Sequence, residues 1–170
     1  MQIRSAVLTD ALAIAEVHVA AWRAAYRGVI PDTTLESLSV PARNAHWSDA
    51  IQRGTPSILV AVPVDSVAGW IAFGPCRDPD KPSHTGELWA MYVSPEHWSG
   101  GIGRALWLAA GEQLRGGGFR SVTLWVLAQN ARACHFYHRV GFRPDPAASK
   151  IRDIGGVSLA EVRYEAQIAA

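Results

Sequence analysis

The residues best suited to chemistry lie in a glycine-rich stretch, MYVSPEHWSGGIGRAL at residues 91–106, between an apolar segment and a helical pattern. The first N–H groups of a helix lack partners within the helix, and the helix dipole places partial positive charge there. Gly100, Gly101 and Gly103 would let an anion approach these amides, because glycine has no Cβ in the way. Arg104 adds a positive charge beside them. The segment therefore predicts a phosphate-binding turn.

Two common phosphate-binding motifs do not fit this turn. A dinucleotide turn needs a third glycine where Leu106 stands, and an acidic residue about 20 residues further on, which is missing. A nucleotide P-loop needs Lys and then Ser or Thr after its last glycine, but Gly103 is followed by Arg104 and Ala105. Two interpretations stay open: a pyrophosphate cradle of another kind, and a turn that only packs a helix on a sheet.

A second motif, NARACHFYHRVGF, occupies residues 130–142. It resembles the Asn-x-x-Ala-x-x-Phe-Tyr-x-x-x-Gly-Phe segment of the GNAT superfamily, the acetyl-CoA-dependent N-acetyltransferases. Residues 98–103, WSGGIG, resemble that family's Gln/Arg-x-x-Gly-x-Gly/Ala signature, with Trp98 as the departure. Residues 22–32, WRAAYRGVIPD, are similar to the first helical region of many bacterial members, so the resemblance covers essentially the whole chain.

The resemblance implies transfer of an acetyl group from acetyl-CoA to a primary amine, by direct attack in a ternary complex. No metal is expected, because none of the six histidines stands at ligand spacing from a carboxylate on a recognisable helix. Trp98 removes one polar side chain from the cradle but leaves the backbone amides. We expect the backbone of Met91 and Val93 to bind the pantetheine amides as a pseudo-strand, while Asn130 caps its helix, contacts the pantetheine arm, or does both. The expected cofactor-binding residues are Met91, Tyr92, Val93, Trp98, Ser99, Gly100, Gly101, Ile102, Gly103, Arg104, Asn130, Ala133 and Tyr137.

Acetyl transfer also needs a proton donor for the leaving thiolate. The resemblance assigns this role to Tyr137, and a phenol with its ordinary pKa of about 10 is protonated at neutral pH. The alternative is that the Tyr137 ring only completes the core against Phe136 and Phe142.

The acceptor must lose a proton, because an alkyl ammonium has a pKa of about 10. Glu87 is the candidate base, since it begins the strand that carries the cofactor. The alternative is a solvated carboxylate at a strand end. His84, His97 and His135 are weaker candidates for the same role.

The acceptor pocket is expected to include Trp22, Tyr26 and Glu87, with contributions from the loop 75–85 and the segment 144–156. The aromatic rings could hold an apolar or cationic group, or belong to the core. The acceptor is a small-molecule or peptide amine that the sequence does not identify. A catalytically silent acyl-CoA sensor or partner module with the same fold is the alternative function.

Periodicity and turn residues predict the elements that position these groups. The expected order is β-α-α-β-β-β-α-β-α-β-β, an α/β (α+β) fold with a mixed, mostly antiparallel twisted sheet and about four helices. The second helical stretch, 33–53, is expected to be interrupted near Pro41, and the closing strands to cover 142–144 and 157–168. In the last strand Glu161, Arg163 and Glu165 alternate with apolar residues, which predicts one solvated face.

Composition restricts the function classes further. The length of 170 residues predicts one domain, 1–170, and the 18% of charged residues argues against disorder. A formal net charge of +1 gives no indication of a nucleic-acid or membrane partner. Two cysteines, no signal peptide and no long apolar run lead us to expect a cytoplasmic location, and a homodimer is an open alternative. The seven tryptophans favour a thick aromatic core over a stacking platform.

Overall fold

The computed structural model describes residues 1–168, which build a seven-stranded sheet with the order β1-β2-β3-β4-β5-β7-β6. Neighbouring strands pair antiparallel, except that β4 and β5 are parallel. The expected mixed, mostly antiparallel sheet is therefore confirmed. The strands are β1 (Gln2–Ser5), β2 (Ser57–Val62), β3 (Gly69–Pro75), β4 (Thr85–Val93), β5 (Ser121–Leu127), β6 (Arg143–Ile154) and β7 (Val157–Gln167).

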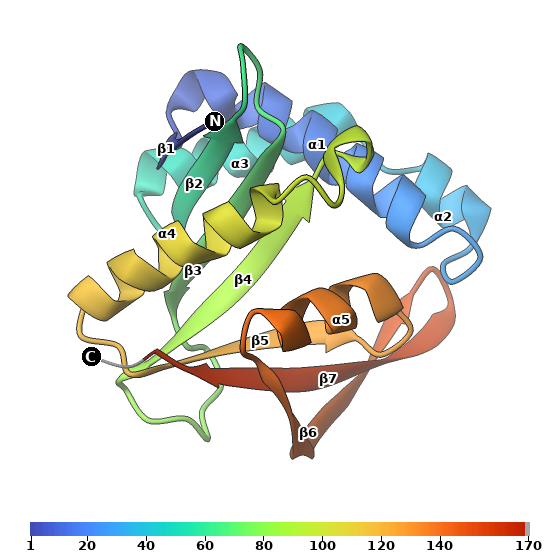
Figure 1. Cartoon of the computed structure of the whole chain (residues 1–170). Coiled ribbons are helices and arrows are strands. Elements are labelled where there is room, and N and C mark those ends of the chain that lie inside the picture. Colours follow the sequence, from blue (N-terminus) through green and yellow to red (C-terminus); the bar gives the residue numbers. More distant parts are fainter. Residues whose placement is uncertain (169–170) are drawn as a thin grey trace.

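Helices cover both faces of this sheet (Figure 1). They are α1 (Ala11–Ala25), α2 (Asp32–Glu36), α3 (Val40–Arg53), α4 (Ile102–Gly116) and α5 (Ala131–Arg139), with short 3-10 turns η1 (Leu8–Asp10) and η2 (Pro95–His97). Because side chains alternate along a strand, Ile58 and Val60 pack in one cluster with α1 and α3, whereas Leu59 and Ala61 pack with α4 in another.

The helical stretch expected over 33–53 is two helices, and the break falls at residues 37–39 instead of at Pro41. Pro41 lies in the first turn of α3, where its missing N–H removes no helical hydrogen bond. The Ser39 side chain caps α3 by accepting from the Ala42 N–H at 3.2 Å. The described part of the chain therefore has five helices where about four were expected.

Strand β6 is far longer than the expected segment 142–144. It is the edge strand of the sheet, and its pairing with β7 shifts register between Pro144 and Ser149. Prolines are tolerated at edges and bulges because no ladder hydrogen bond is lost there. Consequently much of the segment 144–156, expected only as part of the pocket, is a strand.

The solvated face predicted for the last strand is wrong. Glu161 is 6% exposed and Arg163 is 5% exposed. The loop between β3 and β4 is fastened over Arg163, whose guanidinium bonds Asp78 at 3.2 Å and Asp80 at 2.7 and 2.8 Å. The alternation of charged residues along β7 therefore shows correctly that they lie on one face of the sheet. That face is buried because long-range ion pairs cover it.

The central feature of the sheet is a gap between β4 and β5. The two strands pair only over Thr85–Glu87 and Ser121–Thr123, and beyond that point they diverge (Figure 1). From Leu88 onward, the only strand that pairs with β4 among the described residues is β3. The gap opens beside the start of α4 and the start of α5, which brings the two sequence motifs to one place.

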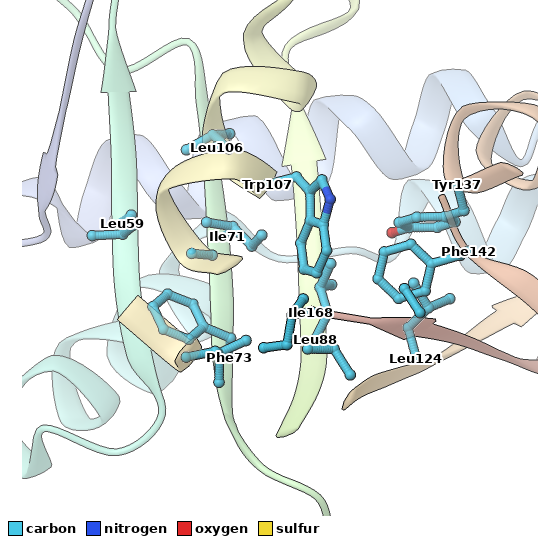
Figure 2. Close-up of a cluster of buried hydrophobic side chains, with 14 of the residues drawn as sticks. Leu59, Ile71, Phe73, Leu88, Leu106, Trp107, Leu124, Tyr137, Phe142 and Ile168 are labelled. Carbon is cyan, nitrogen blue, oxygen red and sulfur yellow. The ribbon is translucent and has the colours of Figure 1, made fainter. Parts of the chain in front are cut away.

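The tryptophans divide between the core and the cavity described below. Trp47 and Trp70 are buried beside His18, and Trp107 packs against Phe142 with ring centroids 4.7 Å apart. Figure 2 shows the hydrophobic cluster that contains Trp107, in which the Tyr137 ring lies next to Phe142. The other four, Trp22, Trp89, Trp98 and Trp125, line the cavity. The expected aromatic core accounts for only part of the tryptophan content.

Candidate active site

One continuous cavity of about 640 Å³ fills the gap between β4 and β5 and reaches both faces of the sheet. On one side it is lined by the glycine turn, the start of α4 and α5. On the other side it is lined by α1, the β6–β7 hairpin and Arg77 from the loop between β3 and β4. A cavity of this form can bring together two ligands that enter from opposite faces.

The glycine turn at residues 98–103 leaves backbone N–H groups without partners at the start of α4. Gly101 is the N-cap residue with φ +85°, a left-handed conformation that favours glycine. No side chain caps α4, and its first helical bond runs from the Ala105 N–H to the Gly101 carbonyl. The N–H groups of Ile102, Gly103 and Arg104 are therefore left for a ligand, as the sequence predicts. A Cβ on Gly103 would meet Phe136 of α5 at 3.3 Å.

Among the expected cofactor-binding residues, only Gly100 does not line the cavity. A Cβ at this position would lie 3.2 Å from the His97 carbonyl oxygen, so Gly100 serves the tight turn. The residues brought together at the cavity are Met91, Tyr92, Val93, Trp98, Ser99, Gly101, Ile102, Gly103, Arg104, Asn130, Ala133 and Tyr137.

The backbone of β4 presents its polar groups to the gap at alternate residues. The Ser94 N–H donates to the Ala68 carbonyl at 2.8 Å, which makes Gly69 and Val93 a non-hydrogen-bonded pair of the β3–β4 ladder. The N–H and C=O of Val93, and of Met91 two residues earlier, therefore point away from β3 and toward the gap. This orientation is the one that pseudo-strand pairing of a pantetheine arm requires.

Trp98 takes up two contacts at the mouth of the gap. Its indole N–H donates to the Val93 carbonyl at 2.8 Å, and the Arg132 guanidinium lies over its ring, 4.2 Å from the centroid. Arg132 and Arg139 of α5 line the cavity together with Arg104. Within residues 1–168 these three arginines form no ion pair, so their charges are uncompensated on this side.

Asn130 caps α5 as expected, since its Oδ1 accepts from the Ala133 N–H at 3.1 Å. Its amide nitrogen also donates to the Tyr26 hydroxyl at 3.3 Å. This second bond ties the end of α1 to the start of α5, and so it fixes Tyr26 across the cavity from the glycine turn. The sequence motif gave no sign of this partner because Tyr26 is more than 100 positions away.

Tyr137 lies on α5 between the core and the cavity. Its ring packs edge-on against Phe136 and Phe142, and the residue is only 7% exposed. Burial raises the pKa of its phenol well above the ordinary value of about 10. The two interpretations of Tyr137 are therefore compatible: its ring belongs to the core, and it also lines the cavity as a protonated phenol.

Glu87 lies where the gap begins and is 2% exposed. Its carboxylate accepts three hydrogen bonds from Arg77: from the backbone N–H at 2.9 Å, from Nε at 3.0 Å and from Nη2 at 2.5 Å. The Arg77 guanidinium also lies over the Trp89 ring, 4.1 Å from its centroid. Glu87 is thus a buried carboxylate with a fixed cation beside it, and the solvated carboxylate considered above does not occur.

The side of the cavity lined by α1 contains both of the aromatic residues expected for the acceptor pocket. Trp22 and Tyr26 line the cavity, with ring centroids 5.0 Å apart. From the segment 144–156, expected to contribute to this pocket, Lys150 and Arg152 line the same wall, although they were not singled out from the sequence. Sequence reasoning missed Glu161 of β7, which the β6–β7 hairpin brings beside them. The alternating charges of these strands were the available signal. Of the candidate histidines, His97 and His135 line the cavity, whereas His84 does not.

Comparison with known proteins defines the class. Residues 16–142 match the model of the Acetyltransferase (GNAT) family, and the chain belongs to this family. It is 35% identical over 160 residues to the N-acetyltransferase YuaI of Bacillus subtilis, covering 94% of this chain and 89% of that protein. It is 30% identical over 144 residues to the L-amino acid N-acyltransferase MnaT of Escherichia coli, covering 84% and 79%.

A solved structure shares the whole architecture. The yncA acetyltransferase of Salmonella typhimurium, determined with acetyl-CoA, has a TM-score of 0.74 and 26% sequence identity, and the similarity covers 100% of this chain and 95% of that one. The chain is therefore an acyl-CoA-dependent N-acetyltransferase with acetyl-CoA as its co-substrate. Within the described residues, no helix is long and apolar enough to cross a membrane, and no cluster of three potential metal ligands occurs.

Proposed function

We propose that this protein acetylates a primary amine by direct attack on acetyl-CoA in a ternary complex. The observation that supports the proposal is the continuous cavity through the β4–β5 gap, which is lined by the uncapped start of α4 on one face of the sheet and by Glu87 on the other. With donor and acceptor held from opposite faces, the two reactants meet in the gap without an acetylated enzyme residue.

The cofactor side is proposed to bind acetyl-CoA through the groups predicted from the sequence. The free N–H groups at the start of α4 suit the pyrophosphate, and the uncompensated Arg104, Arg132 and Arg139 add charge for the phosphates. The gap-facing N–H and C=O groups of Met91 and Val93 suit the two amides of the pantetheine arm. When bound, acetyl-CoA supplies an activated thioester carbonyl.

Tyr137 is proposed as the general acid. Its raised pKa keeps the phenol protonated throughout the neutral range, so it can donate a proton to the departing sulfur. The packing against Phe136 and Phe142 holds the ring in one orientation, and this reduces the entropy lost on reaching the reactive geometry.

Glu87 is proposed as the general base, acting on the amine directly or through a water molecule. A carboxylate offers about four lone-pair sites, and the three Arg77 bonds use two on Oε2 and one on Oε1. The remaining site on Oε1 is available to accept a proton from the acceptor side. Arg77 fixes the direction of that site by holding the carboxylate at three points.

The test is calorimetric titration with acetyl-CoA, followed by a thiol-release assay with a panel of amines. Binding together with turnover of at least one amine supports the transferase. Binding without turnover of any amine favours the alternative, a silent acyl-CoA-binding module. Absence of acetyl-CoA binding by the folded protein contradicts both functions.

A further inference from the structure

Charged and aromatic side chains gather on the acceptor side of the cavity, although they are far apart in sequence. Strand alternation directs them to one face of the sheet, and the loop before β4 adds the guanidinium of Arg77. We call this set the acceptor face: Arg77, Glu87, Trp125, Lys150, Arg152 and Glu161, all of which line the cavity. The charges of this face bear on which second functional group, besides the amine, an acceptor carries.

Both carboxylates of the acceptor face are already paired. Glu87 is held by three bonds from Arg77. The Glu161 side chain, 8% exposed, accepts from Arg152 at 3.2 Å and lies 3.5 Å from the Lys150 ammonium. These are the only carboxylates among the described residues that line the cavity. An acceptor with several ammonium groups would therefore find no carboxylate without a cation.

The cations of the acceptor face are in excess. Lys150 and Arg152 share the single carboxylate of Glu161, so one positive charge stays uncompensated. Their side chains are 48% and 58% exposed, whereas the carboxylate between them is covered. Arg152 uses one of its five N–H donors on Glu161, and within residues 1–168 its guanidinium makes no other hydrogen bond. Donors for an anion therefore remain.

The surroundings hold Lys150 in place. The Lys150 ammonium lies over the Trp125 ring at 3.9 Å from the centroid, and the Trp125 indole N–H donates to Asp78 at 2.9 Å. Asp78 also accepts from Arg163, which anchors the loop that carries Arg77. The charge excess is thus part of a connected structure, and Trp22, Tyr26 and Ile154 provide apolar surface beside it.

From this arrangement we infer that the acceptor is a small amine that also bears a carboxylate, which binds between Lys150 and Arg152, and that its apolar part rests on Trp22 and Tyr26. The inference rests on the proposed transferase function and specifies its substrate class. Bidentate pairing of a carboxylate with a guanidinium would fix the orientation of such an acceptor in the cavity that Glu87 also lines. Both a free amino acid and a short peptide with a terminal carboxylate have this chemistry.

The experiment compares kcat/KM for matched acceptors with the full chain and saturating acetyl-CoA. Leucine, methionine and phenylalanine are each compared with their carboxamide and their decarboxylated amine, and leucyl-glycine and spermidine complete the set. The carboxylate should raise kcat/KM by about 10- to 100-fold over the matched amide. The difference in amine protonation works against this preference. The amide lacks the negative charge of the carboxylate, so its ammonium group has a lower pKa than that of the amino acid. A larger fraction of the amide is therefore present as the free amine.

Variants then locate the preference. Arg152→Gln and Lys150→Gln should each reduce the ratio of amino acid to amide, and Arg152→Lys should restore part of it. Arg53→Gln on α3 is the control, because Arg53 pairs only with Asp49 among the described residues and is absent from the cavity lining. Thermal unfolding of each variant shows whether it folds, and the comparison of acceptors on the unmodified chain needs no variant.

The outcomes separate the inference from the function beneath it. A higher kcat/KM for amino acids than for their amides and decarboxylated amines, if it depends on Arg152 or Lys150, supports the inference for free amino acids. A higher kcat/KM for leucyl-glycine than for leucine, with the same dependence, supports it for peptides. Equal or better turnover of amides, decarboxylated amines or spermidine overturns it while leaving the transferase intact. A ratio that neither variant changes also overturns it. Acetyl-CoA binding with no turnover of any amine overturns the proposed function itself.

Discussion

The Arg132 guanidinium lies over the Trp98 indole ring, 4.2 Å from its centroid, and so joins the turn before α4 to the first turn of α5. Trp98 stands where the family signature has Gln or Arg. The indole carries no charge itself, but the guanidinium of Arg132 binds to its face, since a cation is attracted to the electron-rich ring. The pair thus brings a cation to the mouth of the gap in place of a polar side chain.

Replacing Trp98 with alanine is expected to weaken acetyl-CoA binding about two- to tenfold, because an exposed cation–π contact contributes about 0.5–1 kcal/mol and the bond to Val93 is lost as well. Calorimetric titration measures the dissociation constant. Trp98→Phe, which keeps a ring but no N–H, is the matched control and should lose less. If Trp98→Ala weakens binding equally with and without Arg132→Ala, the two residues do not act together.

Tyr137→Phe is expected to lower kcat about 100-fold or more while changing the acetyl-CoA dissociation constant only a few-fold, since the ring still fills the core and only the proton donor is lost. Steady-state kinetics and calorimetry measure the two quantities. The raised pKa also has a consequence for the unmodified enzyme: ionisation of Tyr137 should not reduce kcat until well above pH 10. An unchanged kcat in Tyr137→Phe would remove its role as the acid.

Glu87→Gln is expected to lower kcat/KM about 100-fold or more and to change the shape of its pH profile, because an amide cannot accept the proton. The profile is the decisive readout, since loss of the Arg77 contacts alone would lower the rate without changing which groups titrate. Arg77→Gln is the matched control that disturbs the same pair from the other side. Superimposable profiles for Glu87→Gln and the unmodified enzyme would exclude Glu87 as the base.

His18 is expected to make the fold less stable in acid. Burial among Trp22, Trp47, Trp70 and Tyr92 lowers its pKa to about 3, from an ordinary value of 6.5. Between these values the unfolded chain binds a proton that the folded chain does not, so stability falls as the pH drops through 6.5 toward 3. Between pH 7 and pH 5, this one group should cost about 2 kcal/mol of unfolding free energy.

Urea unfolding at pH 7 and pH 5 tests this dependence. His18→Gln is the comparison, because glutamine does not titrate while its side chain can still accept the bond that the Trp47 indole donates to His18 Nδ1 at 3.3 Å. The variant should lose about 2 kcal/mol less than the unmodified protein over the same interval. Equal losses in the two proteins would mean that other groups cause the acid sensitivity.

The sequence by itself determined the local parts of the site. Gly101 marks a left-handed residue at a helix start, and Asn130 caps α5 through its Ala133 contact, because both depend on backbone geometry within a few residues. Spacing of glycines and apolar residues was therefore enough to predict the glycine turn before α4 and most of the strand–helix order. The same local signals failed at β6, where prolines at an edge strand obscure the pattern.

The tertiary structure alone decided how these parts become a site. The β4–β5 gap, the Arg77–Glu87 pair and the ion pairs of the buried Glu161 and Arg163 join residues separated by 9 to 85 positions. The sequence does not show which residues pair in this way, since each residue taken alone looks like an ordinary surface charge. Their energies depend on desolvation and on partners supplied by other strands. The sequence thus predicted an acetyl-CoA site, whereas the charge pattern of the acceptor face emerged only when the sheet brought its residues together.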